Sequence, residues 1–73
     1  MTEREERLLG ALVGMAAQYL GEPGNAEAEL DTLCMSAGEA TLEVLAAYGL
    51  VTLTRGGRCG VWTADGQMFR DAH

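Results

Sequence analysis

The sequence predicts a small α+β domain with three helices, a two-stranded β-hairpin and a short C-terminal helical turn. Apolar residues repeat at helical spacing over the first two thirds of the chain. After Gly49 the spacing changes to the alternation typical of strands, and two consecutive glycines interrupt this stretch where a hairpin would turn. A chain of 73 residues is long enough for one small core, so residues 1–73 are predicted to form a single domain.

The first helix is predicted over residues 3–20. Thr2 and Glu5 have the spacing of a capping box, in which each side chain bonds the other residue's backbone N–H. Gly21 is suited to a left-handed stop. The apolar positions recur every three or four residues and are Leu8, Leu9, Leu12, Val13, Ala16, Tyr19 and Leu20.

Two shorter helices are predicted to follow. Asn25 is a good N-cap for a helix that ends near Met35, and Ser36 with Glu39 has the spacing of a second capping box. Gly49 is expected to end the third helix. The apolar residues assigned to the second helix are Leu30, Leu33 and Cys34. Those assigned to the third are Thr41, Leu42, Val44, Leu45 and Tyr48.

The hairpin is predicted from strands at 50–55 and 58–63. Gly56 and Gly57 allow positive φ at both central positions of a two-residue turn. This turn sets a register that pairs Arg55 with Arg58, Leu53 with Gly60, and Val51 with Trp62. Alternation alone does not decide which face meets the helices, and we favour the Trp62 face. Residues 63–66 then open a helical turn that packs Met68 and Phe69.

Charge is distributed unevenly along the chain. There are 11 acidic residues against 5 arginines, no lysine, and a net charge of −6. Residues 1–54 carry a net charge of −7 and residues 55–73 a net charge of +1, and the stretch 8–54 contains no base. A body this acidic opposes the counterion release that supplies most nucleic-acid affinity. Acidic surfaces also serve solubility alone, and this simpler interpretation stays open.

The order of helices and hairpin resembles the winged helix-turn-helix superfamily over about residues 25–70. Leu42-x-x-Leu45-x-x-x-Gly49-Leu50-Val51 is similar to the junction between recognition helix and first wing strand, and 54–60 resembles the wing. Thr63-x-x-Gly66 is similar to the start of the C-terminal helix in such regulators. The resemblance implies a winged-helix-like fold and, in its usual use, a third helix that reads DNA in the major groove.

This chain departs from the superfamily at the positions that would face DNA. The positions of the predicted third helix that would face the DNA groove contain no Arg, Lys, Asn or Gln. The carboxylates of Glu39 and Glu43 would also be repelled by the DNA phosphates. The alternative function is therefore a dimeric DNA-binding transcription regulator that relies on its wing arginines. Its DNA contacts would be Ser36, Ala37, Thr41, Arg55 and Arg58.

The leading hypothesis is a non-catalytic protein-binding regulator or inhibitor that docks an acidic surface on a basic surface of a partner protein. By size and charge only, the chain is similar to small phage-encoded inhibitors such as anti-CRISPR proteins, which occupy basic, nucleic-acid-binding grooves. Steering by charge would weaken with salt. The residues assigned to this surface are Glu27, Glu29, Asp31, Glu39 and Glu43. A structural subunit of a larger assembly is a third interpretation.

A second copy of the chain is a candidate partner for the first helix. Gly10, Gly14 and Ala17 form a stripe of small residues that would let another helix approach closely. Packing within the chain explains the same stripe, and both interpretations stay open.

No enzyme, cofactor or metal site is predicted. Cys34 and Cys59 are far apart in sequence, and the only histidine is His73, so a zinc site is not expected. Cys34 is interpreted as a core thiol, and Cys59 is expected to be exposed on the wing. The chain has no apolar stretch long enough to span a membrane and begins with an acidic segment rather than a signal peptide, so a cytoplasmic location is expected.

Overall fold

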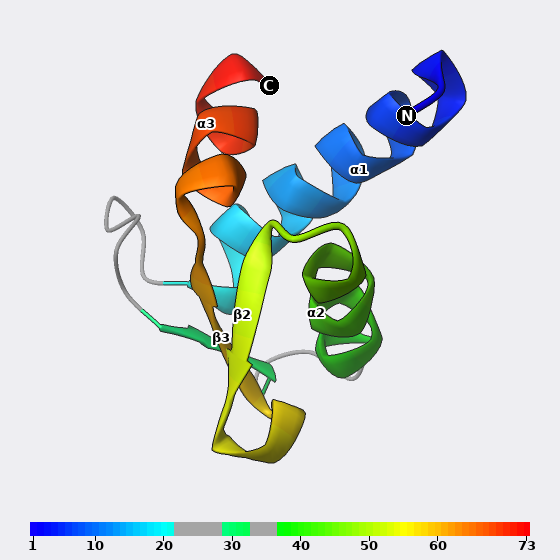
Figure 1. Cartoon of the computed structure of the whole chain (residues 1–73). Helices are drawn as coiled ribbons and strands as arrows, with labels where there is room; N and C mark the ends of the chain where they lie inside the picture. Colours follow the sequence, from blue (N-terminus) through cyan, green and yellow to red (C-terminus); the bar gives the residue numbers. More distant parts are fainter. Residues whose placement is uncertain (22–28, 33–36) are drawn as a thin grey trace.

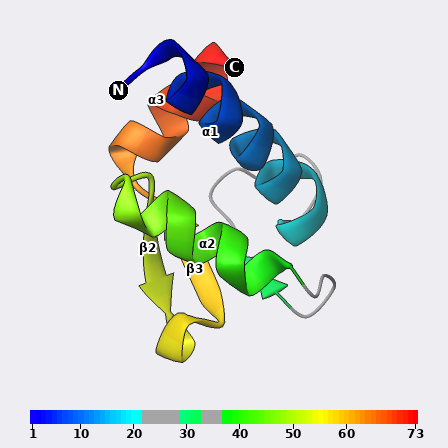
Figure 2. The same ribbon diagram turned by 90° about the vertical axis from the view of Figure 1, so that its right-hand side faces the viewer.

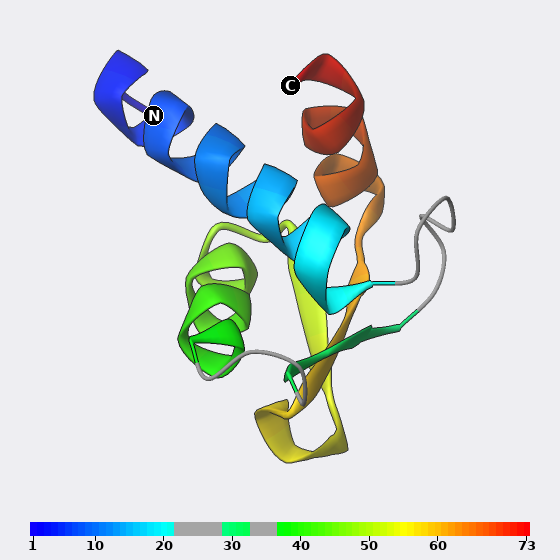
Figure 3. The same cartoon turned by 180° about the vertical axis from the view of Figure 1, so that it is seen from behind.

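The structure is a computed structural model that describes residues 1–21, 29–32 and 37–73. The described residues form an α+β fold in which helices cover one face of a three-stranded antiparallel sheet (Figure 1). The N-terminal helix crosses above the hairpin, a second helix lies beside it, and the C-terminal helix rises from it so that the two chain ends lie at the same end of the molecule (Figures 1 and 3). No helix in these three segments is long and apolar enough to cross a membrane.

The N-terminal helix covers the predicted range. It consists of α1 (Glu3–Met15) and a π-helical last turn, η1 (Ala16–Leu20). The predicted capping box is confirmed: the Glu5 N–H donates to Thr2 Oγ1, and the Thr2 N–H donates to Glu5 Oε1. Gly21 does not adopt the predicted left-handed conformation, because its φ is −110° and its backbone is extended.

The prediction of a helix over residues 25–35 is wrong where the structure describes this stretch. Leu30 and Asp31 form the strand β1 (Leu30–Asp31), which pairs with Gly60 and Cys59 and adds a third strand to the predicted two. Leu30 is still buried, but it enters the core from a strand. Asn25, Leu33, Cys34 and Met35 lie outside the described residues.

The next helix, α2 (Gly38–Ala47), matches the predicted third helix. It begins after Ala37, whose side chain makes no capping hydrogen bond, and Ser36 lies outside the described residues. Gly49 ends it as predicted, in the left-handed conformation with φ +75°. The Leu50 N–H then donates to the Leu45 carbonyl, which leads the chain directly into the sheet.

The hairpin has the predicted register. Strands β2 (Val51–Thr54) and β3 (Cys59–Trp62) pair Val51 with Trp62 and Leu53 with Gly60. Gly56 and Gly57 have the predicted positive φ in the turn η3 (Arg55–Gly57). The sheet order is β1-β3-β2, so β3 is the central strand.

The core lies between the helices and the Trp62 face of the sheet, as favoured from the sequence. Val51 and Trp62 are buried there, whereas Leu53, nearer the tip, is exposed. Each fully buried leucine contributes about 1.5–3 kcal/mol through removal from water. The core cluster contains Leu9, Val13, Ala16, Leu20, Leu30, Leu42, Leu45, Leu50, Val51 and Trp62.

The C-terminal segment is longer than the predicted helical turn. It forms the helix α3 (Ala64–Ala72), capped by Thr63, whose side chain accepts from the Gly66 N–H. Phe69 packs against the core as predicted, but Met68 points to solvent. His73 stacks on Phe69 with ring centroids 4.2 Å apart, and its Nε2 lies 3.5 Å from Glu6 Oε1.

Candidate functional site

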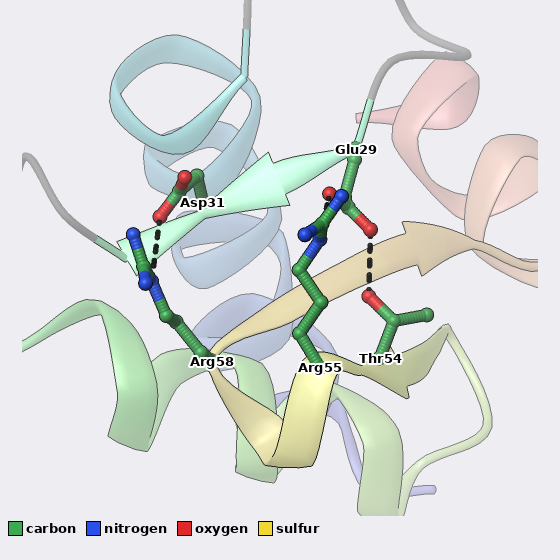
Figure 4. A network of polar contacts seen from close by, with 5 residues as sticks. All are labelled: Glu29, Asp31, Thr54, Arg55 and Arg58. Atoms are coloured by element: carbon green, nitrogen blue, oxygen red, sulfur yellow. Dashed lines mark hydrogen bonds and ion pairs between the residues drawn. The ribbon is translucent and has the colours of Figure 1, made fainter.

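Two acids near β1 and two arginines near the hairpin turn form an ion-pair network (Figure 4). Arg55 Nε lies 3.0 Å from Glu29 Oε1, and Thr54 Oγ1 donates to Glu29 Oε2 at 2.8 Å. Arg58 Nε lies 3.7 Å from Asp31 Oδ1. Pairing of β1 with β3 brings these groups together, because it places residues 29–32 beside the hairpin turn.

The network joins residues that the sequence assigned to two different sites. Glu29 and Asp31 were expected to face a basic partner, and Arg55 and Arg58 were expected to face DNA. Instead, each acid contacts an arginine of the same chain. The hydroxyl of Thr54 and the guanidinium of Arg55 lower the pKa of Glu29, which therefore stays ionised. Two of the nine acids in residues 1–54 are therefore paired with arginines from residues 55–73.

Cys59 lies next to this network, and the expectation that it is exposed is wrong. It is 1% exposed and lies in the central strand, where its paired neighbours are Asp31 and Thr54. Burial raises the pKa of the Cys59 thiol, and the carboxylates of Asp31 and Glu29 raise it further. The thiol is therefore protonated at neutral pH and is a poor nucleophile.

The exposed side of α2 presents the remaining candidate acids. Glu39 and Glu43 are both exposed and lie one turn apart, and α2 contains no basic residue. Ala37 is exposed just before the helix. Thr41 does not face solvent: it is 5% exposed and its hydroxyl donates to the Ala37 carbonyl at 3.0 Å, so it is not placed to contact DNA. Glu27 and Ser36 lie outside the described residues.

An apolar groove runs between α1 and α2, the two helices that share the face seen in Figure 2. Its volume is about 280 Å³. Leu8 is 61% exposed, Tyr48 42% and Val44 40%, although helical spacing assigns all three to the apolar faces of their helices. The residues lining the groove are Glu5, Leu8, Leu9, Ala11, Leu12, Val44 and Tyr48. We refer to this feature as the α1/α2 groove.

The polar groups in the wall of the α1/α2 groove bond to each other. Tyr48 Oη donates to Glu5 Oε2 at 2.7 Å, and Glu5 Oε1 accepts from the Thr2 backbone. The bond from Tyr48 is the main cause of a lowered pKa at Glu5, and the bonds from Thr2 add to it. Glu5 is therefore a carboxylate at neutral pH, and its bond to Tyr48 ties α1 to α2 at this end of the groove.

We expect Tyr48→Phe to lower stability at neutral pH and to lose this effect in acid. The bond lowers the folded-state pKa of Glu5, so its stabilisation is present above the ordinary carboxyl pKa and disappears as the pH falls through the folded value. The measurement is the difference in free energy of unfolding between wild type and variant, from pH 7 to below pH 4 or so. Tyr19→Phe removes a hydroxyl from the exposed Tyr19 and is the control. A difference that stays constant with pH would contradict the assignment.

The small-residue stripe on α1 divides between two environments. A Cβ at Gly10 would lie 3.2 Å from His73 Cδ2, so the absence of a side chain at Gly10 allows His73 to pack closely against α1. Ala17 packs partly buried against the core. Gly14 is exposed, and a Cβ there would have no neighbour within 4 Å. Packing within the chain thus accounts for Gly10 and Ala17 but not for Gly14.

The described residues contain no group of three or more His, Cys, Asp or Glu side chains placed to hold a metal ion. The chain matches no protein-family model, no curated protein and no solved structure.

Proposed function

We propose that this chain is a non-catalytic protein-binding regulator or inhibitor that docks the acidic face of α2 on a basic surface of a partner protein. The observation that carries the proposal is the position of Glu39 and Glu43, exposed one turn apart on a helix that has no base. A like-charge pair at this spacing is unfavourable for the helix itself. Exposed charge of one sign steers association with a surface of the opposite sign.

The ion-pair network supports placing the docking surface on α2. Glu29 and Asp31 already contact Arg55 and Arg58, so they contribute less field at a distance than their number implies. No cation within α2 offsets the charge of its two glutamates. The carboxylates of this helix are therefore the better candidates for steering a partner.

We propose a winged-helix-like arrangement in which α2 corresponds to the recognition helix and the hairpin to the wing. Two features support it: the chain passes directly from α2 through Gly49 into β2, and the helix α3 follows β3. The partner surface that we propose is a basic groove that binds nucleic-acid phosphates, because its positive charge is complementary to a compact body of net charge −6. Small phage-encoded inhibitors of the anti-CRISPR type act on such surfaces.

We expect Glu39→Lys/Glu43→Lys to weaken partner binding by at least about tenfold at low salt. The partner would be isolated by affinity capture with the wild-type chain, identified and purified, and its dissociation constant measured across a salt series. Asp65→Lys/Asp71→Lys makes the same change of net charge on α3 and is the matched control. Equal losses in both variants would show a dependence on net charge alone, and an unchanged affinity in the α2 variant would remove this helix as the docking surface.

We expect the chain not to bind a mixed-sequence DNA duplex. Fluorescence anisotropy at about 50 mM salt, where phosphate contacts are strongest, should show no rise up to tens of micromolar protein. The reason is that Arg55 and Arg58 contact Glu29 and Asp31 while the body of the protein is acidic. A salt-sensitive rise that is lost in Arg55→Ala/Arg58→Ala would favour the DNA-binding alternative instead.

A further inference from the structure

The α1/α2 groove adjoins the acidic face of α2 but is chemically different from it. Its exposed lining is almost entirely apolar, and the two polar groups in its wall, the Glu5 carboxylate and the Tyr48 hydroxyl, bond to each other. The groove therefore favours an apolar side chain over one that needs a hydrogen-bond partner. Leu8 from α1 and Val44 from α2 form opposite walls that such a side chain would contact.

The apolar surface continues from the groove toward the acids of α2. Ala40 and Ala47 are exposed and lie one turn before and after the position of Val44 and Glu43. Their methyl side chains form a flat apolar surface between the groove and Glu43. An element lying along α2 would thus meet apolar groups on one side and carboxylates on the other.

The charges around this surface select a cationic occupant. Glu39 and Glu43 lie on α2, and Glu5 is an ionised carboxylate in the groove wall. Arg4 and Arg7 line a neighbouring hollow that shares Leu8 and Ala11 with the groove, and Arg7 is paired there with Glu3 at 3.3 Å. A second copy of the chain would bring another body of net charge −6 to the same place, which like-charge repulsion opposes.

We propose that the α1/α2 groove binds the apolar face of a basic amphipathic helix of the partner protein, with the lysines or arginines of that helix directed to Glu39 and Glu43. This inference rests on the proposed function and deepens it, because it names the element of the partner that is bound. A helix presents apolar anchors at intervals of three and four residues and cations beside them, which matches a groove with acids along one side.

The test uses two fluorescein-labelled peptides of about 18 residues with identical leucine and lysine content. One has its leucines at helical spacing, and the other has the same residues in a non-amphipathic order. Anisotropy titrations with the full chain are expected to give at least about tenfold tighter binding of the amphipathic peptide. Leu8→Ser/Val44→Ser is expected to remove this preference, and Met68→Ser, at an exposed position on α3, is expected to preserve it.

The variants separate failure of this inference from failure of the proposed function. Glu39→Gln/Glu43→Gln is expected to weaken both peptides equally and to reduce the salt dependence of binding. Two results would show that the groove is not the binding site: the wild type does not distinguish the peptides, or Leu8→Ser/Val44→Ser keeps the preference. If the glutamate variant still weakens binding in either case, the proposed docking through the acidic face of α2 is retained. If the glutamate variant has no effect on either peptide, the proposed function fails as well.

Sedimentation equilibrium tests the competing occupant. The wild-type chain is expected to be a monomer at the concentrations of the titrations. A dimer that Leu8→Ser/Val44→Ser converts to monomers would show that a second copy fills the groove, and would overturn the inference.

Discussion

Replacing Gly66 with alanine is expected to lower the free energy of unfolding by about 3 kcal/mol or more. Gly66 lies in the first turn of α3 and is buried. A Cβ on it would overlap the backbone carbonyl of Leu50 and lie 3.0 Å from Trp62 Cε3. That carbonyl also accepts from the Thr63 N–H at 3.1 Å, so it cannot move aside without breaking the connection between β2 and the start of α3.

The measurement is urea unfolding followed by the fluorescence of Trp62, the single tryptophan of the chain. A domain of this size has a total stability of about 4–11 kcal/mol, so the expected loss is a large part of it. Gly14→Ala is the matched control, because Gly14 is helical and exposed with open space at its Cβ. Alanine there should raise stability by about 0.5–1 kcal/mol. Similar stabilities for the Gly66 variant and the wild type would contradict the packing of α3 on Leu50.

Elements defined by short-range signals could be predicted from the sequence. The capping box of Thr2 and Glu5 specifies the start of α1 within four residues, and Gly49 specifies the end of α2 through its own backbone conformation. The pair Gly56–Gly57 specifies the hairpin register, since the turn determines which residues lie opposite each other. In each case the residues that carry the signal are also the residues that form the structure.

The third strand could not be predicted in the same way. Leu30 and Asp31 form a strand only because they pair with Gly60 and Cys59, about 30 positions later in the chain. A strand of two residues is too short to show alternation, so the spacing of Leu30 and its apolar neighbours indicates a helix instead. Its burial was predicted correctly because Leu30 is apolar, but its element depends on a partner distant in sequence.

The candidate site shows the same division between local and distant information. Counting charges along the sequence places nine of the eleven acids in residues 1–54 and three of the five arginines in residues 55–73. The sheet nevertheless brings Arg55 Nε to 3.0 Å from Glu29 Oε1. Helical spacing placed Leu8 and Val44 on apolar faces, but spacing does not show that the two helices leave a groove where these side chains meet. Among the candidate acids that the structure describes, Glu39 and Glu43 are exposed on α2 as predicted, because the apolar face of this helix specifies its opposite side.

Cys59 is expected to react with thiol reagents at least about a hundredfold more slowly in the folded chain than in the urea-unfolded chain. The experiment uses a Cys34→Ser background, so that Cys59 is the only thiol. Its side chain is almost fully removed from solvent in the central strand. Its pKa is raised, first by burial and then by Asp31 and Glu29, so less of the reactive thiolate forms at a given pH.

The control for this experiment is Met68→Cys in a background in which both native cysteines are replaced by serine. Met68 is 71% exposed, so the new thiol should react at the rate of an unfolded chain. Rapid labelling of Cys59 would require β3 to become accessible beside the ion-pair network, because Asp31 and Thr54 are its paired neighbours. Such opening would also free Arg55 and Arg58 from Glu29 and Asp31, and the hairpin would then become a stronger candidate for contact with nucleic acid than the acidic face of α2.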